Sequence, residues 1–154
     1  MHGNNLKDSA TLGYLINEVG KLFKRRFEEE ARVHGITLPQ WRTLAMISRS
    51  EGTTQAALAA AIDSDPMTMS GILDRLEKRG LVERFPDPRD SRAKAARLTA
   101  AGTEMVSTAR EVGMGIYRQS MEGISLTQQQ RLAVALTRVR DNLNGMSAEH
   151  KETA

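Results

Sequence analysis

The chain has 154 residues, of which 40% are hydrophobic and 27% charged, and its formal net charge is +3. That length suffices for one globular domain with a hydrophobic core, and the absence of cysteine excludes disulfides and thiolate metal sites. No apolar run reaches the ~18 residues that a membrane helix needs, and the N-terminus lacks the pattern of a secretory signal. These observations predict a cytoplasmic protein with no membrane partner.

The first predicted element is a long amphipathic helix within residues 10–36. Its apolar residues recur at steps of three and four, which places them on one stripe, and Gly35 offers a stop signal. A helix of about 24 residues spans roughly 36 Å, which is more than so small a domain would cover by itself. We therefore expect the stripe to pack partly against a second copy of the chain. Its members are Leu12, Leu15, Ile16, Val19, Leu22, Phe23 and Phe27.

Short helices are predicted to follow over residues 37–80. Thr37 and Gln40 form a capping-box pattern at the start of the first, and Asp65 with Pro66 opens the last, residues 66–79. The last two of these short helices are joined by a tight polar turn, which is typical of a helix-turn-helix. Helix pairs of this kind also occur in plain bundles. The helix at 66–79 would be the reader of DNA. Its predicted buried stripe is Met69, Ile72, Leu73 and Leu76.

Residues 81–99 are predicted to form a β-hairpin. The prolines Pro86 and Pro88 exclude a helix across "PDPRD". The tail "AKAARLT" favours a helix by propensity, but a strand that ends at a Pro-rich turn needs a partner for its backbone groups. The window 78–97 holds seven basic and three acidic side chains, a local charge of +4. Such a patch suggests a polyanionic partner, with an ordinary solvated surface as the alternative. A basic hairpin directly after a helix-turn-helix is the winged-helix arrangement.

The last third, residues 100–145, is predicted to be helical again. Thr99 can cap a helix that begins near residue 100, and Thr127 with Gln130 forms a second capping box. The apolar residues that follow are spaced like the seam of a coiled coil or bundle. Because no third layer would cover the stripes at both ends, we predict that they pack together and on a second copy. The seam residues are Leu132, Leu136, Val139 and Leu143.

The predicted fold is thus a single domain over residues 1–154, mainly α with a small β-hairpin wing. A winged helix-turn-helix at 37–99 lies between dimerisation helices at 10–36 and 100–145. A homodimer of this kind would present two reader helices to successive turns of a palindromic duplex DNA.

The motifs "RLEKRGLVER" and "DPRDSRAKAARLTAAG" resemble the MarR family of transcriptional regulators, and "DSRAK" is most similar to the SlyA branch. The resemblance covers about residues 10–145. It implies a homodimer whose helix 66–79 enters the major groove and whose wing 81–99 reaches the minor groove. It also implies a repressor or anti-silencer whose DNA affinity responds to a small phenolic or aromatic effector.

The resemblance assigns DNA-contacting roles to residues of the wing. Arg92 corresponds to the wing-tip arginine that enters the minor groove, and arginine suits a narrow, electronegative groove. Asp90 would hold an arginine partner and shape the wing, while Arg89 and Lys94 would contact phosphates.

In the reader helix, the base-facing positions of the family correspond to Met67, Thr68 and Gly71. SlyA-like proteins carry an arginine at the position of Gly71, so a bidentate guanine contact is lost there. Specificity would then rest on Thr68, on apolar contact between Met67 and thymine methyl groups, and on DNA shape. The complete predicted DNA-binding set is Thr54, Gln55, Met67, Thr68, Ser70, Gly71, Arg75, Arg89, Asp90, Arg92 and Lys94.

The resemblance places an effector site between the dimer helices and the winged helix. Trp41, the one tryptophan of the chain, is predicted to belong to the core, yet it falls at the expected edge of this site. An apolar, aromatic-walled cleft near a cation suits phenolic carboxylates such as salicylate. The candidate wall residues are Tyr14, Phe23 and Trp41.

No cofactor, metal site or enzymatic activity is expected. The three histidines lack ligand spacing, and the chain has no glycine-rich phosphate loop and no nucleophile elbow. Two alternatives to a DNA-binding regulator stay open. One is a winged-helix adaptor that binds a protein partner without DNA, and the other is a small-molecule-binding scaffold.

Overall fold

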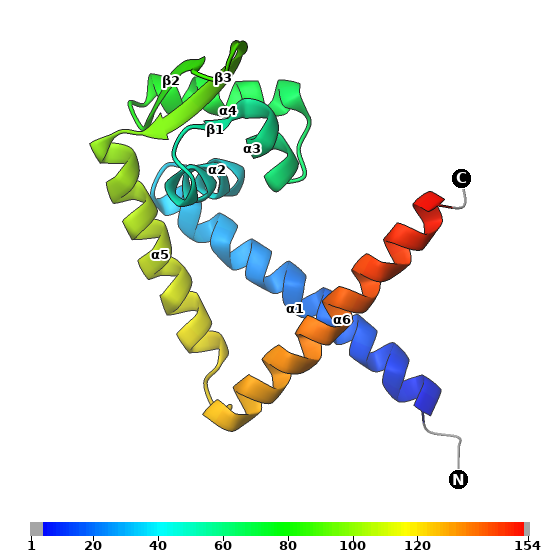
Figure 1. Ribbon diagram of the computed structural model, residues 1–154. Coiled ribbons are helices and arrows are strands. Elements are labelled where there is room, and N and C mark those ends of the chain that lie inside the picture. Colours follow the sequence, from blue (N-terminus) through cyan, green and yellow to red (C-terminus); the bar gives the residue numbers. More distant parts are fainter. Residues whose placement is uncertain (1–4, 153–154) are drawn as a thin grey trace. The chain divides into compact units, whose positions relative to one another are not determined.

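The computed structural model describes the backbone of residues 5–152 and the side chains of residues 11–146 (Figure 1). The chain divides after Ile116 into two compact units, so the single domain predicted over 1–154 stays a prediction. The elements in chain order are α1 (Asn5–Val33), α2 (Leu38–Arg49), β1 (Thr53–Thr54), α3 (Gln55–Ala61), α4 (Pro66–Lys78), β2 (Val82–Asp87), β3 (Asp90–Leu98), α5 (Ala100–Ser120) and α6 (Leu126–Glu152).

The core of the first unit lies among α2, α3, α4 and the sheet. Leu44 and Ile47 of α2, Leu58 of α3 and Leu76 of α4 are fully buried in one cluster. The cluster continues into the sheet through Val82 and into the end of α1. This arrangement confirms the predicted fold class, mainly α with a β wing. It also confirms the predicted buried stripe of α4, which is Met69, Ile72, Leu73 and Leu76.

Local capping chemistry sets the helix ends, as predicted. Gly35, at φ 65°, follows the end of α1 in the left-handed conformation that glycine adopts readily. At the start of α2, the Gln40 side chain accepts a hydrogen bond from the Thr37 N–H at 3.0 Å, and Thr37 Oγ1 accepts from the Gln40 N–H at 3.4 Å. At the start of α4, Asp65 Oδ1 accepts from the Thr68 N–H at 2.8 Å.

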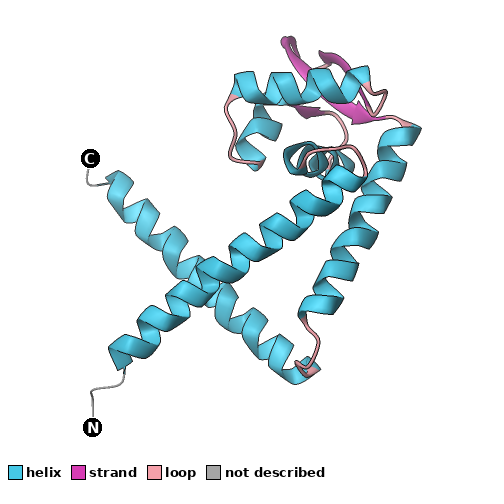
Figure 2. Ribbon diagram, turned by 180° about the vertical axis from the view of Figure 1, so that it is seen from behind, coloured by secondary structure: helices cyan, strands magenta, loops and turns pink. Residues whose placement is uncertain are grey.

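The segment predicted as a hairpin is β2 paired antiparallel with β3, and residues 92–98 are strand rather than helix. A third strand, β1, was not predicted. Thr53 pairs with Ala96 and Thr54 with Ala95, so β3 is the central strand. The strands are drawn in magenta in Figure 2. Both alanines are buried, and the backbone bonds available on both edges of β3 override their helical propensity. The strand also does not stop at the prolines, because β2 continues through Pro86 to Asp87 with a register shift between them.

A close approach joins the wing to α5. Thr99 Oγ1 accepts from the Gly102 N–H at 3.1 Å and donates to the Gly80 carbonyl at 2.6 Å, so it caps α5 as predicted. A Cβ added at Gly102 would lie 2.0 Å from the Leu81 carbonyl oxygen. Only glycine therefore allows α5 to begin this close to the end of α4 and the start of β2.

The second unit consists of the end of α5, a turn and α6. The capping box predicted at Thr127 and Gln130 is wrong. Ser125 and Gln128 form it instead, with Ser125 N–H donating to the Gln128 side chain at 2.9 Å and Ser125 Oγ accepting from the Gln128 N–H at 3.3 Å. Because α6 begins at Leu126, Ser125 is the residue just outside the helix and Thr127 already lies in its first turn.

The apolar stripes at the two ends of the chain lie at the surface of the single chain. In α1, Leu12, Leu15, Ile16, Val19 and Leu22 are exposed, and Phe23 and Phe27 are half-buried. In α6, the predicted seam of Leu132, Leu136, Val139 and Leu143 is exposed as well. No helix among the described residues is both long and apolar enough to cross a membrane.

Candidate nucleic-acid interface

The core holds α4 so that its opposite face is turned outward. Met67, Thr68 and Arg75 are exposed on that face, and Ser70 and Gly71 are half-buried. The helical spacing of the buried stripe predicts Met67, Thr68, Gly71 and Arg75 on this side of the helix. The structure thus presents all of the predicted reader positions on a surface that faces away from the core.

The first turn of α4 is locked by Asp65. Besides accepting the Thr68 N–H, this carboxylate accepts the Thr68 hydroxyl through Oδ2 at 2.6 Å. The hydroxyl bond, followed by the backbone bond, holds the pKa of Asp65 below its ordinary value. The Thr68 hydroxyl proton is therefore already engaged within the protein.

Residues far apart in the sequence meet in a hollow of about 440 Å³ between the two recognition elements. We call it the reader–wing groove, lined by Thr54, Gln55, Ser70, Arg84, Arg92 and Lys94. Five of these six residues belong to the predicted DNA-binding set, and the structure brings them together from β1, α3, α4 and β3. Its lining combines hydroxyl and amide groups with cations, which are the groups that contact a phosphate backbone.

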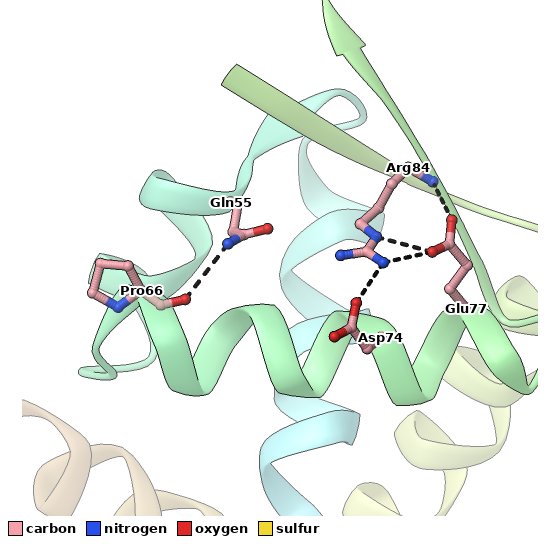
Figure 3. Close-up of polar contacts among 5 residues, drawn as sticks. All are labelled: Gln55, Pro66, Asp74, Glu77 and Arg84. Atoms are coloured by element: carbon pink, nitrogen blue, oxygen red, sulfur yellow. Dashed lines mark hydrogen bonds and ion pairs between the residues drawn. The ribbon is translucent and has the colours of Figure 1, made fainter. Parts of the chain in front are cut away.

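Gln55 fixes the mutual position of the two helices at this groove. Thr54 Oγ1 caps α3 by accepting the Ala57 N–H at 3.2 Å. The Gln55 side chain, one residue later, donates to the Pro66 carbonyl in the first turn of α4 at 3.5 Å (Figure 3). The start of α3 is thereby tied to the start of the reader helix.

Arg84 on β2 ties the wing to the reader helix, and sequence reasoning missed it. Its guanidinium is 2.5 Å from Asp74 and 2.7 Å from Glu77, both on α4 (Figure 3). The Glu77 carboxylate also accepts the Arg84 N–H at 3.2 Å. The hydrogen bond from the Arg84 side chain is the main cause that lowers the pKa of Glu77, and the same bond raises the pKa of Arg84. The Arg84 side chain is 16% exposed.

The wing tip is shaped by two carboxylates rather than one. Asp90 Oδ1 accepts the Arg92 N–H at 3.0 Å, which shapes the turn. The predicted role of Asp90 in holding an arginine side chain falls instead to Asp87. That carboxylate accepts the Arg89 N–H at 2.9 Å and lies 3.3 Å from the Arg89 guanidinium, and these contacts lower its pKa. The register shift at Pro86 and Asp87 turns Asp87 inward, where only 5% of it is exposed.

The cationic side chains of the wing tip therefore differ in whether a carboxylate pairs with them. Arg89 is paired with Asp87. Within the part of the chain that the structure describes, no carboxylate pairs with the side chains of Arg92 or Lys94, and both line the reader–wing groove. Their cationic groups are thus available to a polyanion, and the predicted contacts of the two residues with DNA stay a prediction.

A second cavity, of about 370 Å³, lies in the first unit at the predicted edge of the effector site. Its apolar wall includes Phe27, Leu38 and Trp41, and three arginines line it as well. Trp41 is 3% exposed, and its Nε1 is buried without a hydrogen-bond partner. Of the three predicted wall residues the structure brings only Trp41 here. Tyr14 is exposed and hydrogen-bonds Glu18 on its own helix, and Phe23 lies one helical turn before Phe27. The arginines are Arg42, Arg49 and Arg110.

The described residues contain no group of three or more histidine and acidic side chains that could hold a metal ion.

Comparison with known proteins gives matches that agree on one family. A family model, the MarR family, matches residues 36–94. The chain is 35% identical over 107 residues to the HTH-type transcriptional repressor Rv2887 of Mycobacterium tuberculosis, an alignment that covers 70% of this chain and 77% of that protein.

Solved structures are similar over most of the chain. Wild-type MarR from E. coli in its apo form has a TM-score of 0.75 at 26% identity and covers 83% of this chain and 95% of its own. The MepR–DNA complex from S. aureus has a TM-score of 0.73 at 24% identity, with coverages of 86% and 97%, and at that identity it shows the shared fold alone.

Proposed function

The chain belongs to the MarR family and is a DNA-binding transcriptional regulator rather than an enzyme, and from this premise we propose that it acts as a homodimer on palindromic duplex DNA. The observation that carries the proposal is the reader–wing groove. It joins the exposed face of α4 to the free cations Arg92 and Lys94. Binding of chromosomal DNA would place the protein in the cytoplasm.

Each recognition element has its own groove in the proposed complex. The helix α4 enters the major groove, which is wide enough for a helix. The wing reaches the minor groove with Arg92, whose guanidinium suits the negative potential there. Thr54, Gln55 and Lys94 contact phosphates and set the register of the complex. The tip sequence "DSRAK" and the turn that Asp90 braces support a wing of the SlyA type.

The proposed dimer uses the exposed stripes of the terminal helices. An apolar row along α1 and another along α6 are larger than isolated surface residues and mark an interaction surface. A two-fold dimer would bury both rows and present two α4 helices to one palindrome. The long α1 supports this arrangement, since 29 residues extend well beyond the core that α2, α3 and α4 form.

The proposed effector is a small phenolic or aromatic acid, bound in the cavity beside Trp41. The Trp41 ring supplies an aromatic wall, and Arg42, Arg49 and Arg110 supply cations for a carboxylate. Because the cavity adjoins α2, which packs on α4, binding there can alter how the reader helix meets DNA and so make the protein a ligand-responsive repressor or anti-silencer.

The DNA-binding proposal is tested by a gel shift on the DNA upstream of the protein's own coding sequence, repeated at rising salt. We expect a complex containing two chains whose affinity falls with salt, because cations displace condensed counterions. Arg92→Ala should weaken it and reduce the salt slope by about one per protomer. A DNA affinity that does not depend on salt, together with capture of a protein partner, would instead indicate a winged-helix adaptor.

The effector proposal has a direct optical test, because Trp41 is the one tryptophan of the chain. Salicylate should change its fluorescence saturably and release the protein from DNA over the same concentration range. Arg110→Gln should weaken both effects, and Arg118→Gln, a variant on the same helix outside the cavity, should not. An unchanged fluorescence up to millimolar salicylate would remove this ligand class.

A further inference from the structure

Resting on the proposed binding of α4 in the major groove, we propose that the reader helix recognises the 5-methyl group of thymine through Met67, in place of a polar contact to a purine. The inference specifies which chemical feature of the operator the first two turns of α4 read. Four observations on this part of the helix carry it.

The first observation is the exposure of Met67. The side chain is 84% exposed on the first turn of α4, opposite the buried stripe. A long, flexible thioether fits irregular apolar surfaces well. Among the groups on the floor of the major groove, the thymine methyl is the one apolar group. Contact with it would remove both apolar surfaces from water.

The second observation is that Thr68 has no hydroxyl proton to offer. Its Oγ1 donates to Asp65 at 2.6 Å, and the same carboxylate also holds the Thr68 N–H. What Thr68 can still present to a base is its methyl group and the acceptor lone pairs of its oxygen. A donor to guanine O6 or N7, the acceptors that mark guanine in the major groove, is therefore not available at this position.

The third observation concerns Gly71, four residues after Met67 and hence on the same face. A Cβ added there would meet nothing within 4 Å, and its φ is not positive, so neither packing nor backbone conformation requires glycine. Helical side chains cover the surface over the turn before their own Cα. A long side chain at 71 would therefore cover the patch around Met67, and glycine leaves that patch open.

The fourth observation is the charge pattern of α4. Residues 66–73 contain no charged side chain, and Asp74 is engaged by Arg84 at 2.5 Å. Arg75 is thus the first cation of the helix, more than two turns after its start. The N-terminal part of α4 cannot make the bidentate contact that arginine makes to guanine. Beside the Ser70 hydroxyl and the acceptor lone pairs of Thr68, apolar contact through Met67 is the base-specific chemistry that this part of the helix offers.

The test uses duplexes enriched by the full-length protein from a randomised DNA library. Each thymine of an enriched site is then replaced singly by deoxyuridine, which removes the 5-methyl group and changes nothing else in the base pair. The affinity of the wild type should fall about fourfold at one thymine in each half-site, the value of one buried methyl group. It should stay constant at the other positions of the reader contact.

Variants assign that effect to Met67. In Met67→Ala the ratio between the thymine and uracil duplexes should fall to about one, and in Met67→Leu it should persist, because leucine keeps an apolar contact. Met114→Ala, at an exposed methionine on α5, should retain the wild-type ratio. Equal thermal stability of the variants would show that the fold is intact.

The outcomes separate this inference from the proposed function. If duplexes are enriched but no thymine is sensitive, or if the sensitivity survives in Met67→Ala, methyl recognition by Met67 is wrong while DNA binding stands. If the protein enriches no duplex at all, the proposed function fails and this inference fails with it.

Discussion

The winged-helix region and the terminal helices place their leucines in opposite environments. In residues 37–99, Leu44, Leu58 and Leu76 are fully buried by side chains of the same chain. In α1 and α6, Leu12 and Leu132 are exposed, although they recur with the same helical regularity. Regular apolar spacing thus specifies a helix face in both regions, but among the described residues only the first region shows that face covered by the same chain. The difference supports the proposal that one region recognises DNA and the other assembles the dimer.

The largest expected effect comes from placing charge on the α6 seam. Leu132→Glu combined with Leu136→Glu should convert the dimer to single chains, because two carboxylates would be buried without partners. A single chain offers only one reader helix and one wing to the DNA, so its DNA affinity should be lower by about a hundredfold or more. Light scattering after size exclusion measures the first effect and fluorescence anisotropy the second. Gln130→Glu on the same helix should do neither, and a dimer that survives the double substitution would show that this seam is not the interface.

The second prediction compares a leucine from each region. Leu44→Ala should reduce the free energy of unfolding by about 2–5 kcal/mol, as a large-to-small change in a closed core does, and leave dimer dissociation unchanged. Leu12→Ala should instead raise the dissociation constant of the dimer. Urea titrations that follow Trp41 fluorescence and sedimentation at several protein concentrations separate the two. If the two variants changed unfolding free energy and dimer dissociation alike, the buried and the exposed leucines would not have different roles.

A smaller effect is expected within the winged helix, at the tie between wing and reader. Arg84→Met should destabilise the protein by about 1 kcal/mol, less than is typical of hydrogen bonds to charged groups, because Asp74 and Glu77 are 53% and 40% exposed and regain water. The matched control is Arg97→Met, whose pair with Glu83 is more than half exposed on both sides and should contribute about 0.5 kcal/mol or less. Chemical denaturation measures both losses of unfolding free energy. Equal losses would show that the pairs of Arg84 contribute no more than an exposed surface ion pair.

The smallest expected effect is the pH dependence of the stability that the Glu77–Arg84 ion pair contributes. Because the pKa of Glu77 is lower in the folded chain than its ordinary value of 4.5, its contribution to stability is complete above pH 4.5. It is lost as the pH falls through the lowered folded value. The gap in stability between wild type and Glu77→Gln should therefore narrow on acidification below pH 4.5. A gap that stays constant in acid would mean that the charge of Glu77 does not contribute.

Local chemistry predicted most of the helix ends and the face of α4. The caps at Thr37 and Asp65 each involve residues at most three positions apart, so a local sequence motif is enough to predict them. At the start of α6 two capping boxes overlap, with Ser125 and Gln128 two residues before Thr127 and Gln130, and the pattern alone could not choose between them. Residues 92–98 favour a helix by propensity. They were predicted as a strand because the backbone N–H and C=O groups of the preceding strand need hydrogen-bond partners.

What the sequence could not contain are the pairings between distant elements. The strand β1 has two residues and acquires its identity from Ala95 and Ala96, more than 40 positions later. Arg84 lies seven and ten residues from its carboxylates, spacings to which no helix or strand rule applies. The contact of Asp87, rather than Asp90, with an arginine side chain accompanies a register shift between Pro86 and Asp87. The cavity beside Trp41 depends on how α1, α2 and α5 converge.

We propose that two chains, each with its own reader helix α4 and wing, assemble through their terminal helices on one palindrome. Sedimentation of the full-length protein with an enriched palindromic duplex, and with the same duplex cut to one half-site, tests it most directly. We expect two chains in the free protein, two chains on the full site, and a far weaker complex on the half-site. A single chain that binds both duplexes with equal affinity would contradict the account.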